Sequence, residues 1–325
     1  MTSHGEHRLA RMSWVPVVDL SSPDAPRAVA DACERVGFLA VVGHGIAPHV
    51  VDAAWRTAGA FFDLALDERM SVAMPTPGYP YGYSPIAGET LAASLGARAL
   101  PDLKESFAIG PVDRPTHEIT DPDESFAWSE NLWPRALPEL RPAWEEYFRA
   151  CSDLAARLMS TMALGLGLPP DHFASMIDRH TSAMRALRYP GRDTAGDLDE
   201  TQLGASAHTD YGTLTILLAD PVQGGLQVQD PSGRWHDVDA PWGTFVVNLG
   251  DAMARWTNDR WRSTMHRVTV PRAQRQSIAF FHNANWDAVI ECLPACLGPG
   301  ETPRHAPIAA GPHLMGKFRS TVNPA

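Results

Sequence analysis

Hydrophobic spacing divides the chain into a first part with helical periods and a second part with strand periods. Residues 15–20 (VPVVDL) and 38–46 (FLAVVGHGI) are short apolar runs typical of buried strands. Residues 21–37 and 48–70 repeat apolar positions every three or four residues, which predicts two helices. The longest helical pattern covers residues 142–164 and ends in a Gly/Pro-rich segment. The first part therefore predicts strands alternating with helices.

After Ser182 the hydrophobic period shortens to that of a strand, in which alternate residues share a face. Short strands are predicted at AMRALRY, TLTILLA, GLQVQD, RWHDV, TFVVNLG, MHRVTV and QSIAFFH. The segments DPSGR and PRAQR between them are turn-like. Many short strands at this spacing predict a sandwich or barrel. Because no repeat or clear linker interrupts the sequence, we predict a single domain over residues 1–325, mainly β, with N-terminal helices packed on the β-core.

Residues 75–90 form a run dense in Pro, Gly and Tyr. Such a run cannot hold a regular ladder of backbone hydrogen bonds, so it predicts a loop. Loops of this kind form either the wall of a site or a plain surface connection. The sequence leaves both interpretations open.

Composition restricts the class of protein. The chain has 325 residues, of which 44% are hydrophobic and 20% charged, as in a globular protein with a sizeable core. A net charge of −11 argues against nucleic acid as a partner. No apolar run is long enough to span a membrane, and the N-terminus lacks the plan of a secretory signal. We therefore expect a cytoplasmic enzyme with a small-molecule substrate, and reduced thiols at its four cysteines.

The stretch AHTDYGTLTIL places His208 and Asp210 two residues apart. On a strand, residues at this spacing point to the same face. A His-X-Asp pair alone is weak evidence, but His266 lies at another predicted strand start, in STMHRVTV. Two histidines and one carboxylate are the ligand set of non-haem Fe(II) sites with open positions. Zinc with a bound water is the competing interpretation.

Arg275 and Ser277, in RQSIAFF, are also predicted to share a strand face. An arginine binds a carboxylate through two parallel hydrogen bonds, and a serine adds a hydroxyl donor. Because His266 and Arg275 flank the PRAQ turn, we predict that they lie on neighbouring strands. Arg275 and Ser277 can together hold the distal carboxylate of 2-oxoglutarate while the keto-acid end chelates the metal.

The combined pattern HTD…HRV…RQS resembles the 2-oxoglutarate/Fe(II)-dependent dioxygenases of the isopenicillin N synthase-like type. The segments VPVVDL, ERVGFLAVVGHGI, GGLQVQDPSGRW and SIAFFHNAN are similar to other parts of that family, so the resemblance covers nearly the whole chain. It implies a double-stranded β-helix (jelly-roll) core over residues 182–285, preceded by an N-terminal dioxygenase segment over residues 14–115.

The resemblance also implies roles for individual residues. Fe(II) would be ligated by His208, Asp210 and His266, and the 2-oxoglutarate carboxylate would be bound by Arg275 and Ser277. Tyr189, in RYP, matches a family tyrosine that often reaches the co-substrate or the substrate. One departure concerns Leu187, which stands where plant members commonly carry Asn, so a polar contact to the keto acid is missing.

The implied reaction uses O2 to decarboxylate 2-oxoglutarate to succinate and CO2 while a small molecule of specialised metabolism is hydroxylated, desaturated or cyclised. The residues that would contact that substrate are expected among Tyr81, Tyr83, Phe107, Arg185 and His282. Ethylene formation from 2-oxoglutarate itself is a lesser possibility.

Three other interpretations use the same residues. An Fe(II) oxidase of the isopenicillin N synthase kind would keep the metal ligands and use the Arg-X-Ser pair for its substrate. A zinc hydrolase would need a general acid or base that the sequence does not nominate. A non-catalytic sensor would bind metal and keto acid without turnover.

Overall fold

A computed structural model describes residues 14–76, 78–86, 88, 91, 100–116, 118–196, 198–199 and 201–322 of the chain. The N-terminal residues 1–13 and parts of the predicted loop 75–90, at residues 77, 87, 89 and 90, lie outside the described residues.

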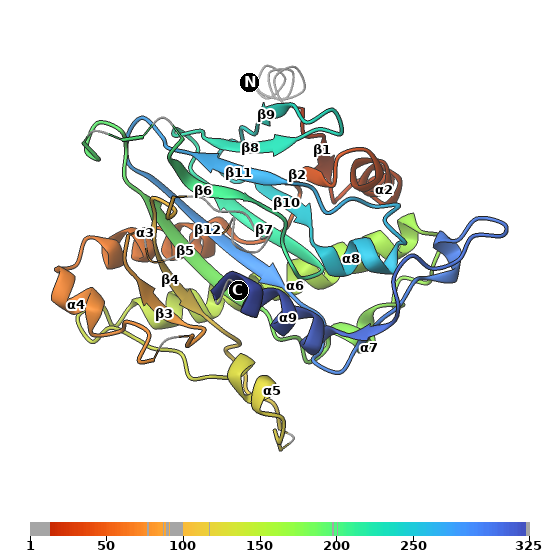
Figure 1. Cartoon of the computed structure of the whole chain (residues 1–325), viewed down its shortest axis with the longest axis horizontal. Coiled ribbons are helices and arrows are strands. Elements are labelled where there is room, and N and C mark those ends of the chain that lie inside the picture. Colours follow the sequence, from red (N-terminus) through yellow and green to blue (C-terminus); the bar gives the residue numbers. More distant parts are fainter. Residues whose placement is uncertain are drawn as a thin grey trace.

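Two antiparallel-rich sheets face each other and form the core of the protein (Figure 1). The larger has the order β1-β2-β10-β7-β12-β5-β4-β3, with strands Val17–Asp19, Phe38–Val42, Phe245–Leu249, Leu214–Ala219, Arg275–His282, Ala183–Tyr189, Glu105–Ile109 and Gly82–Ser84. The smaller has the order β6-β11-β8-β9, with strands Leu203–His208, His266–Thr269, Leu226–Gln229 and Trp235–Asp237. A separate pair joins β13 (Val289–Ile290) to β14 (Ile308–Ala309). The predicted β-core of short strands is therefore present.

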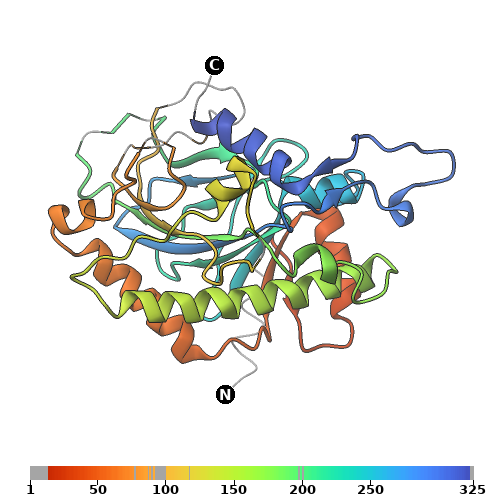
Figure 2. The ribbon, with the colours of Figure 1, turned by 90° about the horizontal axis from the view of Figure 1, so that it is seen from below.

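The described residues form helices on both sides of the two sheets (Figure 2). Their bounds are Ala25–Arg35 (α2), Pro48–Phe62 (α3), Leu66–Met70 (α4), Pro122–Ala127 (α5), Leu140–Gly165 (α6), Ala174–Ile177 (α7), Asp251–Trp256 (α8) and Ala310–Val322 (α9). Helix α6 packs against α2 and α3. Figure 2 shows α6 along one side of the sheets and α9 on the opposite side. The long helix predicted at residues 142–164 is confirmed, with small extensions at both ends.

Strand alternation divides the larger sheet into a core face and a cavity face. On β5, Met184 and Ala186 are buried in the core beneath the helices, whereas Arg185, Leu187 and Tyr189 point to the other side. The same alternation on β12 sends Ile278 and Phe280 to the core and the intervening residues inward. The two inner faces enclose a cavity of about 770 Å³.

The prediction of a single helix over residues 48–70 is wrong, because the helix is interrupted between α3 and α4. Arg188 of β5 donates hydrogen bonds to the Asp63 carboxylate at 2.9 Å and to the Phe62 carbonyl. The guanidinium of Arg188 is thus the hydrogen-bond partner of the carbonyl of the last residue of α3, in place of an N–H group from a further helical turn. The amphipathic pattern continues across the break because Leu64 still packs on the core.

The predicted pairing of the strands that carry His266 and Arg275 is also wrong. Strand β11 pairs with β6 and β8 in the smaller sheet, whereas β12 pairs with β5 and β7 in the larger one. The PRAQ turn therefore crosses from one sheet to the other. The two residues line the cavity from opposite sheets.

Phe107, expected to contact substrate, lies on the core face of β4. It is fully buried, and its ring centroid lies 4.4 Å from that of Phe61 and 5.3 Å from that of Trp144. The ring does not line the cavity. The prediction that Phe107 contacts substrate is therefore wrong, and its side chain packs between β4, α3 and α6.

None of the helices in the described part of the chain combines the length and the apolar content needed to cross a bilayer.

Replacing Phe107 by Ala should lower the free energy of unfolding by about 3–5 kcal/mol, as for other buried aromatic truncations. The half-buried, cavity-lining Phe281 offers a matched control, and Phe281→Ala should cost much less stability because it leaves less of a sealed void. Urea denaturation of both variants measures the difference. Equal losses would contradict the placement of Phe107 in the sealed core.

Candidate metal centre

Three side chains converge where the smaller sheet meets the larger one. His208 is the last residue of β6, His266 is the first residue of β11, and the two are direct partners in the ladder. Asp210 Oδ1 lies 3.8 Å from His208 Nε2 and 3.7 Å from His266 Nε2. One ligand atom from each residue can be chosen such that all three lie within 4.8 Å of one another. This is the only such cluster of His, Cys and acidic residues within the part of the chain that the structure describes.

Asp210 reaches the cluster from a loop, because β6 ends at His208. The expectation that strand alternation would align the two residues is therefore wrong, although they do meet. The second oxygen of the carboxylate, Oδ2, accepts hydrogen bonds from Thr215 Oγ1 at 2.5 Å and from Asn248 Nδ2 at 2.7 Å. Both donors come from the larger sheet, so Oδ1 is left facing the two imidazoles.

The loop backbone is fixed by a close approach to the segment before α8. The Asp251 N–H donates to the Asp210 carbonyl at 2.8 Å. A Cβ added to Gly250 would lie 2.2 Å from the Gly212 carbonyl oxygen, so only glycine permits this approach. The ligand-bearing loop is thereby held against the start of α8.

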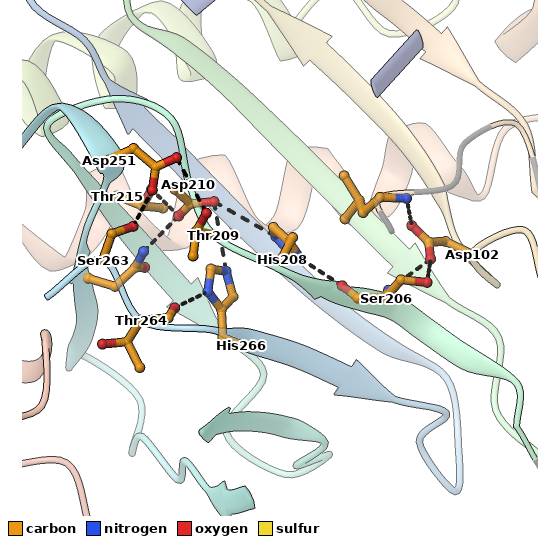
Figure 3. A network of polar contacts seen from close by, with 12 residues as sticks. Asp102, Ser206, His208, Thr209, Asp210, Thr215, Asp251, Ser263, Thr264 and His266 are labelled. Atoms are coloured by element: carbon orange, nitrogen blue, oxygen red, sulfur yellow. Dashed lines mark hydrogen bonds and ion pairs between the residues drawn. The ribbon is translucent and has the colours of Figure 1, made fainter. Parts of the chain in front are cut away.

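Backbone carbonyls orient both histidines (Figure 3). His208 Nδ1 lies 2.7 Å from the Ser206 carbonyl, and His266 Nδ1 lies 3.1 Å from the Thr264 carbonyl. Since a carbonyl only accepts, each Nδ1 carries the proton and each Nε2 offers its lone pair toward Asp210. This is the arrangement that metal-binding histidines commonly adopt.

Burial sets the charge of the ligands. Desolvation, followed by the nearby His266, lowers the pKa of His208 to about 4, so that imidazole is neutral at neutral pH. Burial alone would raise the pKa of Asp210, but His266, His208 and the hydrogen bonds from Asn248 and Thr215 outweigh it and lower that pKa. Two imidazoles and a carboxylate are the ligand set that fits an Fe(II) ion with open positions for further ligands.

Arg275 lies in the same cavity and is only 2% exposed. Its Nη1 donates to Ser277 Oγ at 3.3 Å, and its guanidinium lies 5.0 Å from the centre of the Tyr189 ring. Among the described residues, no carboxylate pairs with Arg275, and its Nε has no hydrogen-bond partner. A buried guanidinium without an acidic partner is costly. This position therefore fits the carboxylate of a ligand.

The family becomes clear when the chain is compared with known proteins. The model of the 2OG-Fe(II) oxygenase superfamily matches residues 181–284, and that of the non-haem dioxygenase in morphine synthesis N-terminal segment matches residues 15–136. The 2-oxoglutarate-Fe(II) type oxidoreductase hxnY of Emericella nidulans is 35% identical over 302 residues, which are 91% of this chain and 84% of that protein. The chain belongs to the 2-oxoglutarate/Fe(II)-dependent dioxygenases.

Solved structures of relatives agree with this assignment. A full-length Neurospora crassa protein in complex with alpha-KG and thymine matches with a TM-score of 0.81 and 29% identity, over 94% of this chain and 96% of that one. JOX2 in complex with 2OG, Fe and JA matches with a TM-score of 0.78 and 28% identity, over 96% and 86% of the two chains. The jelly-roll prediction is confirmed, and the dioxygenase uses Fe(II), 2-oxoglutarate and O2. The oxidase, hydrolase and sensor interpretations are not favoured.

Three of the expected substrate residues line the cavity of the dioxygenase, namely Tyr81, Tyr83 and Arg185. The hydroxyl of Tyr81 donates to the Ala127 carbonyl at 2.5 Å, and that of Tyr83 donates to Glu105 at 2.6 Å. Both hydroxyls are therefore engaged within the protein. Tyr83 is the ladder partner of Phe107, and its ring packs edge-on against Phe61, so its side chain lies on the core face of the sheet and is not a substrate contact.

His282, the remaining expected substrate residue, does not line the cavity. It is buried beneath the metal loop, where Nδ1 lies 2.6 Å from Thr213 Oγ1. Burial, with a contribution from His180, lowers the pKa of His282 well below its usual value. Its place in the structure is that of a neutral core residue.

Sequence reasoning missed several cavity residues of the dioxygenase. Phe281 follows the alternation of Arg275 and Ser277 along β12, so the strand period could have found it. Lys104, next to β4, also lines the cavity. No local signal points to the residues that α9 contributes, namely Leu314, Met315 and Phe318. Helix α9 contacts the loop that carries Asp210 through His313, whose Nε2 lies 3.2 Å from the Tyr211 carbonyl, and it is tied to the start of α8 by an ion pair of 2.7 Å between Lys317 and Asp251.

The neutral state of His282 predicts a pH dependence of stability. The unfolded chain takes up a proton near pH 6.5, whereas the folded chain resists it, so the free energy of unfolding should fall as the pH drops below 6.5. One such histidine costs about 1 kcal/mol between pH 6.5 and 5.5. His282→Asn keeps a partner for Thr213 and does not titrate, so its urea-unfolding free energy should fall less steeply by that amount. Parallel pH profiles of the two proteins would contradict a neutral, buried His282.

Proposed function

We propose that His208, Asp210 and His266 hold the Fe(II) of this dioxygenase, and that Arg275 with Ser277 holds the distal carboxylate of 2-oxoglutarate. The observation that carries the proposal is a buried guanidinium, without an acidic partner among the described residues, in the same cavity as the three ligands. An anion with a carboxylate at one end and a chelating keto acid at the other satisfies both groups at once.

The metal supplies the O2-dependent decarboxylation of 2-oxoglutarate to succinate and CO2, coupled to oxidation of a substrate C–H bond. The protein orients the ligands and excludes water from the site. Asp210 keeps one oxygen toward the metal position because Thr215 and Asn248 occupy the other. Apolar side chains surround the co-substrate position and exclude water there, namely Leu187, Leu217, Leu226 and Val268. Leu187 offers no polar contact to the keto acid, so we expect the metal and Arg275 to carry most of its binding.

The Tyr189 ring completes the co-substrate position. Its face lies against the Arg275 guanidinium, which favours a cation there and orients the fork of donors. The ring also lies so close to Gly204 that a Cβ on that residue would come within 2.8 Å of it. We therefore assign Tyr189 to the positioning of Arg275.

The prime substrate we propose is a small molecule with a flat apolar body and an anionic group. Aromatic residues are frequent in the remaining cavity wall, namely Tyr79, Tyr81, Phe126, Phe281 and Phe318. Arg185 adds positive charge to the lining, whereas the charge of Lys104 is paired with Asp102, and Asp210 is the only carboxylate among the described residues of the lining. One relative was solved with thymine, another with JA, and a third is named Validamycin A dioxygenase, so the bound or named compounds differ among relatives. We therefore assign none of these compounds to this protein. A cytoplasmic location, a role in specialised metabolism and the choice between hydroxylation, desaturation and cyclisation stay predictions.

Anaerobic titration with Fe(II) and then 2-oxoglutarate tests the assignment of the metal and co-substrate residues. A visible metal-to-keto-acid charge-transfer band should form in the wild type and be lost in His208→Ala. Arg275→Ala should need at least about 30-fold more 2-oxoglutarate to form the band, since truncation of a buried charge partner costs at least about 2 kcal/mol of binding free energy.

Arg267→Ala is the matched control for Arg275→Ala. Arg267 lies next to His266 on β11, but it contacts Gln227 and Trp235 and does not line the cavity. Its 2-oxoglutarate affinity should equal that of the wild type. Iron binding without any charge-transfer band in the wild type would refute the 2-oxoglutarate assignment.

Succinate release tests the proposed substrate class. Aryl carboxylates such as indole-3-acetate and benzoate are added to the enzyme with Fe(II) and 2-oxoglutarate, and the corresponding amides are added in parallel reactions. Acids should stimulate succinate release at least about tenfold more than their amides, because a buried charged hydrogen bond contributes about 1.5–3 kcal/mol. Arg185→Gln should remove this preference. Equal stimulation by acids and amides would rule out the anionic substrate.

A further inference from the structure

A buried ion pair lies beside the metal centre without belonging to it. Lys104 Nζ is 2.6 Å from Asp102 Oδ2, and the two side chains are 2% and 0% exposed. Lys104 immediately precedes β4 and lines the cavity. A pair this deeply buried forfeits the hydration of both charges, so it contributes little net stability by itself.

Asp102 joins this pair to a metal ligand. Its Oδ1 accepts hydrogen bonds from Ser206 N at 2.8 Å and from Ser206 Oγ at 2.7 Å, and its Oδ2 also accepts from Leu91 N at 3.1 Å. The Ser206 carbonyl in turn accepts the Nδ1 proton of His208. Figure 3 shows this continuous path from Asp102 through Ser206 to the ring of His208.

The backbone around Ser206 explains why such support is needed. Strand β6 is an edge strand that pairs only with β11 in the described sheet. The ladder pairs His266 with His208 but Val268 with Ala205, so β6 contains one extra residue at this point. A bulge of this kind leaves backbone groups without ladder partners and re-aims the side chains next to it. Asp102 supplies the missing acceptor for the Ser206 N–H at that bulge.

We propose that Asp102 is a positioning residue for His208, a role that rests on the metal-binding function assigned to His208 above. Asp102 clamps the Ser206 peptide in the bulge, and the clamped carbonyl aims Nε2 of His208 toward Asp210. Lys104 supplies the counter-charge that lets a carboxylate do this inside the fold. His266 needs no such device, because its supporting residue Thr264 is tied by Oγ1 to the Val36 carbonyl at 2.7 Å.

The test measures Co(II) affinity in the metal-free full-length protein, because Co(II) reports the site without turnover. The double variant Asp102→Ala/Lys104→Met removes both charges together and leaves Ser206 without its acceptor. Its Kd for Co(II) should rise about 10–100-fold, the range found when residues that support metal ligands are removed. The d–d absorption bands of bound Co(II) should also shift, because the His208 ring is no longer aimed.

A conservative variant separates positioning from general loss of structure. Asp102→Asn/Lys104→Met keeps an amide oxygen for Ser206, so Co(II) affinity and the d–d bands should return most of the way to wild type. Glu105→Gln is the matched control, because Glu105 is an equally buried ion-pair carboxylate on β4 that contacts Arg69 and Arg188 instead of a metal ligand. Its Kd for Co(II) should stay within about twofold of wild type, since independent sites do not couple.

The outcomes separate this inference from the proposed function. If the wild type binds Co(II) and the Asp102→Ala/Lys104→Met protein binds it equally well, the positioning role is overturned while the metal site stands. If the wild type does not bind Co(II), or binds it unchanged in His208→Ala, the metal assignment itself fails and the positioning role fails with it. If that double variant does not fold, Asp102→Leu/Lys104→Met decides, because leucine fills the space of the carboxylate but accepts no hydrogen bond from the Ser206 N–H: a Kd raised threefold or more supports the clamp, and an unchanged Kd overturns it.

Discussion

A buried carboxylate that faces two imidazoles is the constraint on which the rest of the site depends. Asp210 is held ionised by its hydrogen bonds from Thr215 and Asn248 and by the nearby histidines, while burial keeps the His208 ring neutral. These opposite protonation states are the ones that a divalent metal requires, because a proton on any of the three ligands would compete with it. The loops, the close glycine contact and the flanking polar residues all serve to keep these three atoms together.

The two sheets give the dioxygenase a core and a cavity from the same strands. On β5 and β12, one face packs under α6 with residues such as Met184 and Phe280, while the other face presents Arg185 and Arg275 to the interior. A strand has only two faces, so a change in the core of this sheet changes the floor of the cavity as well. The smaller sheet faces this floor and carries the two histidines at the ends of neighbouring strands.

Polar groups near the metal centre are supported from opposite sides. Asp102 holds the Ser206 peptide behind His208, whereas Asp251 meets the loop that carries Asp210 and also pairs with Lys317 of α9. The first contact lies on the side of the N-terminal segment and the second on the side of the C-terminal helix. The centre therefore depends on parts of the chain that are more than 200 residues apart in sequence.

The sequence by itself determined the chemistry. Residue type, spacing and family resemblance nominated the proposed site residues, namely His208, Asp210, His266, Arg275 and Ser277, and the strand period located the β-core. Only the tertiary structure decided that His266 and Arg275 lie on opposing sheets, that Phe107 and His282 are buried packing residues, and that α3 ends at an arginine from β5. It alone also brought α9 and the Asp102–Lys104 pair to the cavity. The physical reason is that periodicity fixes which face of an element a side chain occupies, whereas contacts between distant elements depend on how the sheets close around the cavity, and no local pattern encodes that.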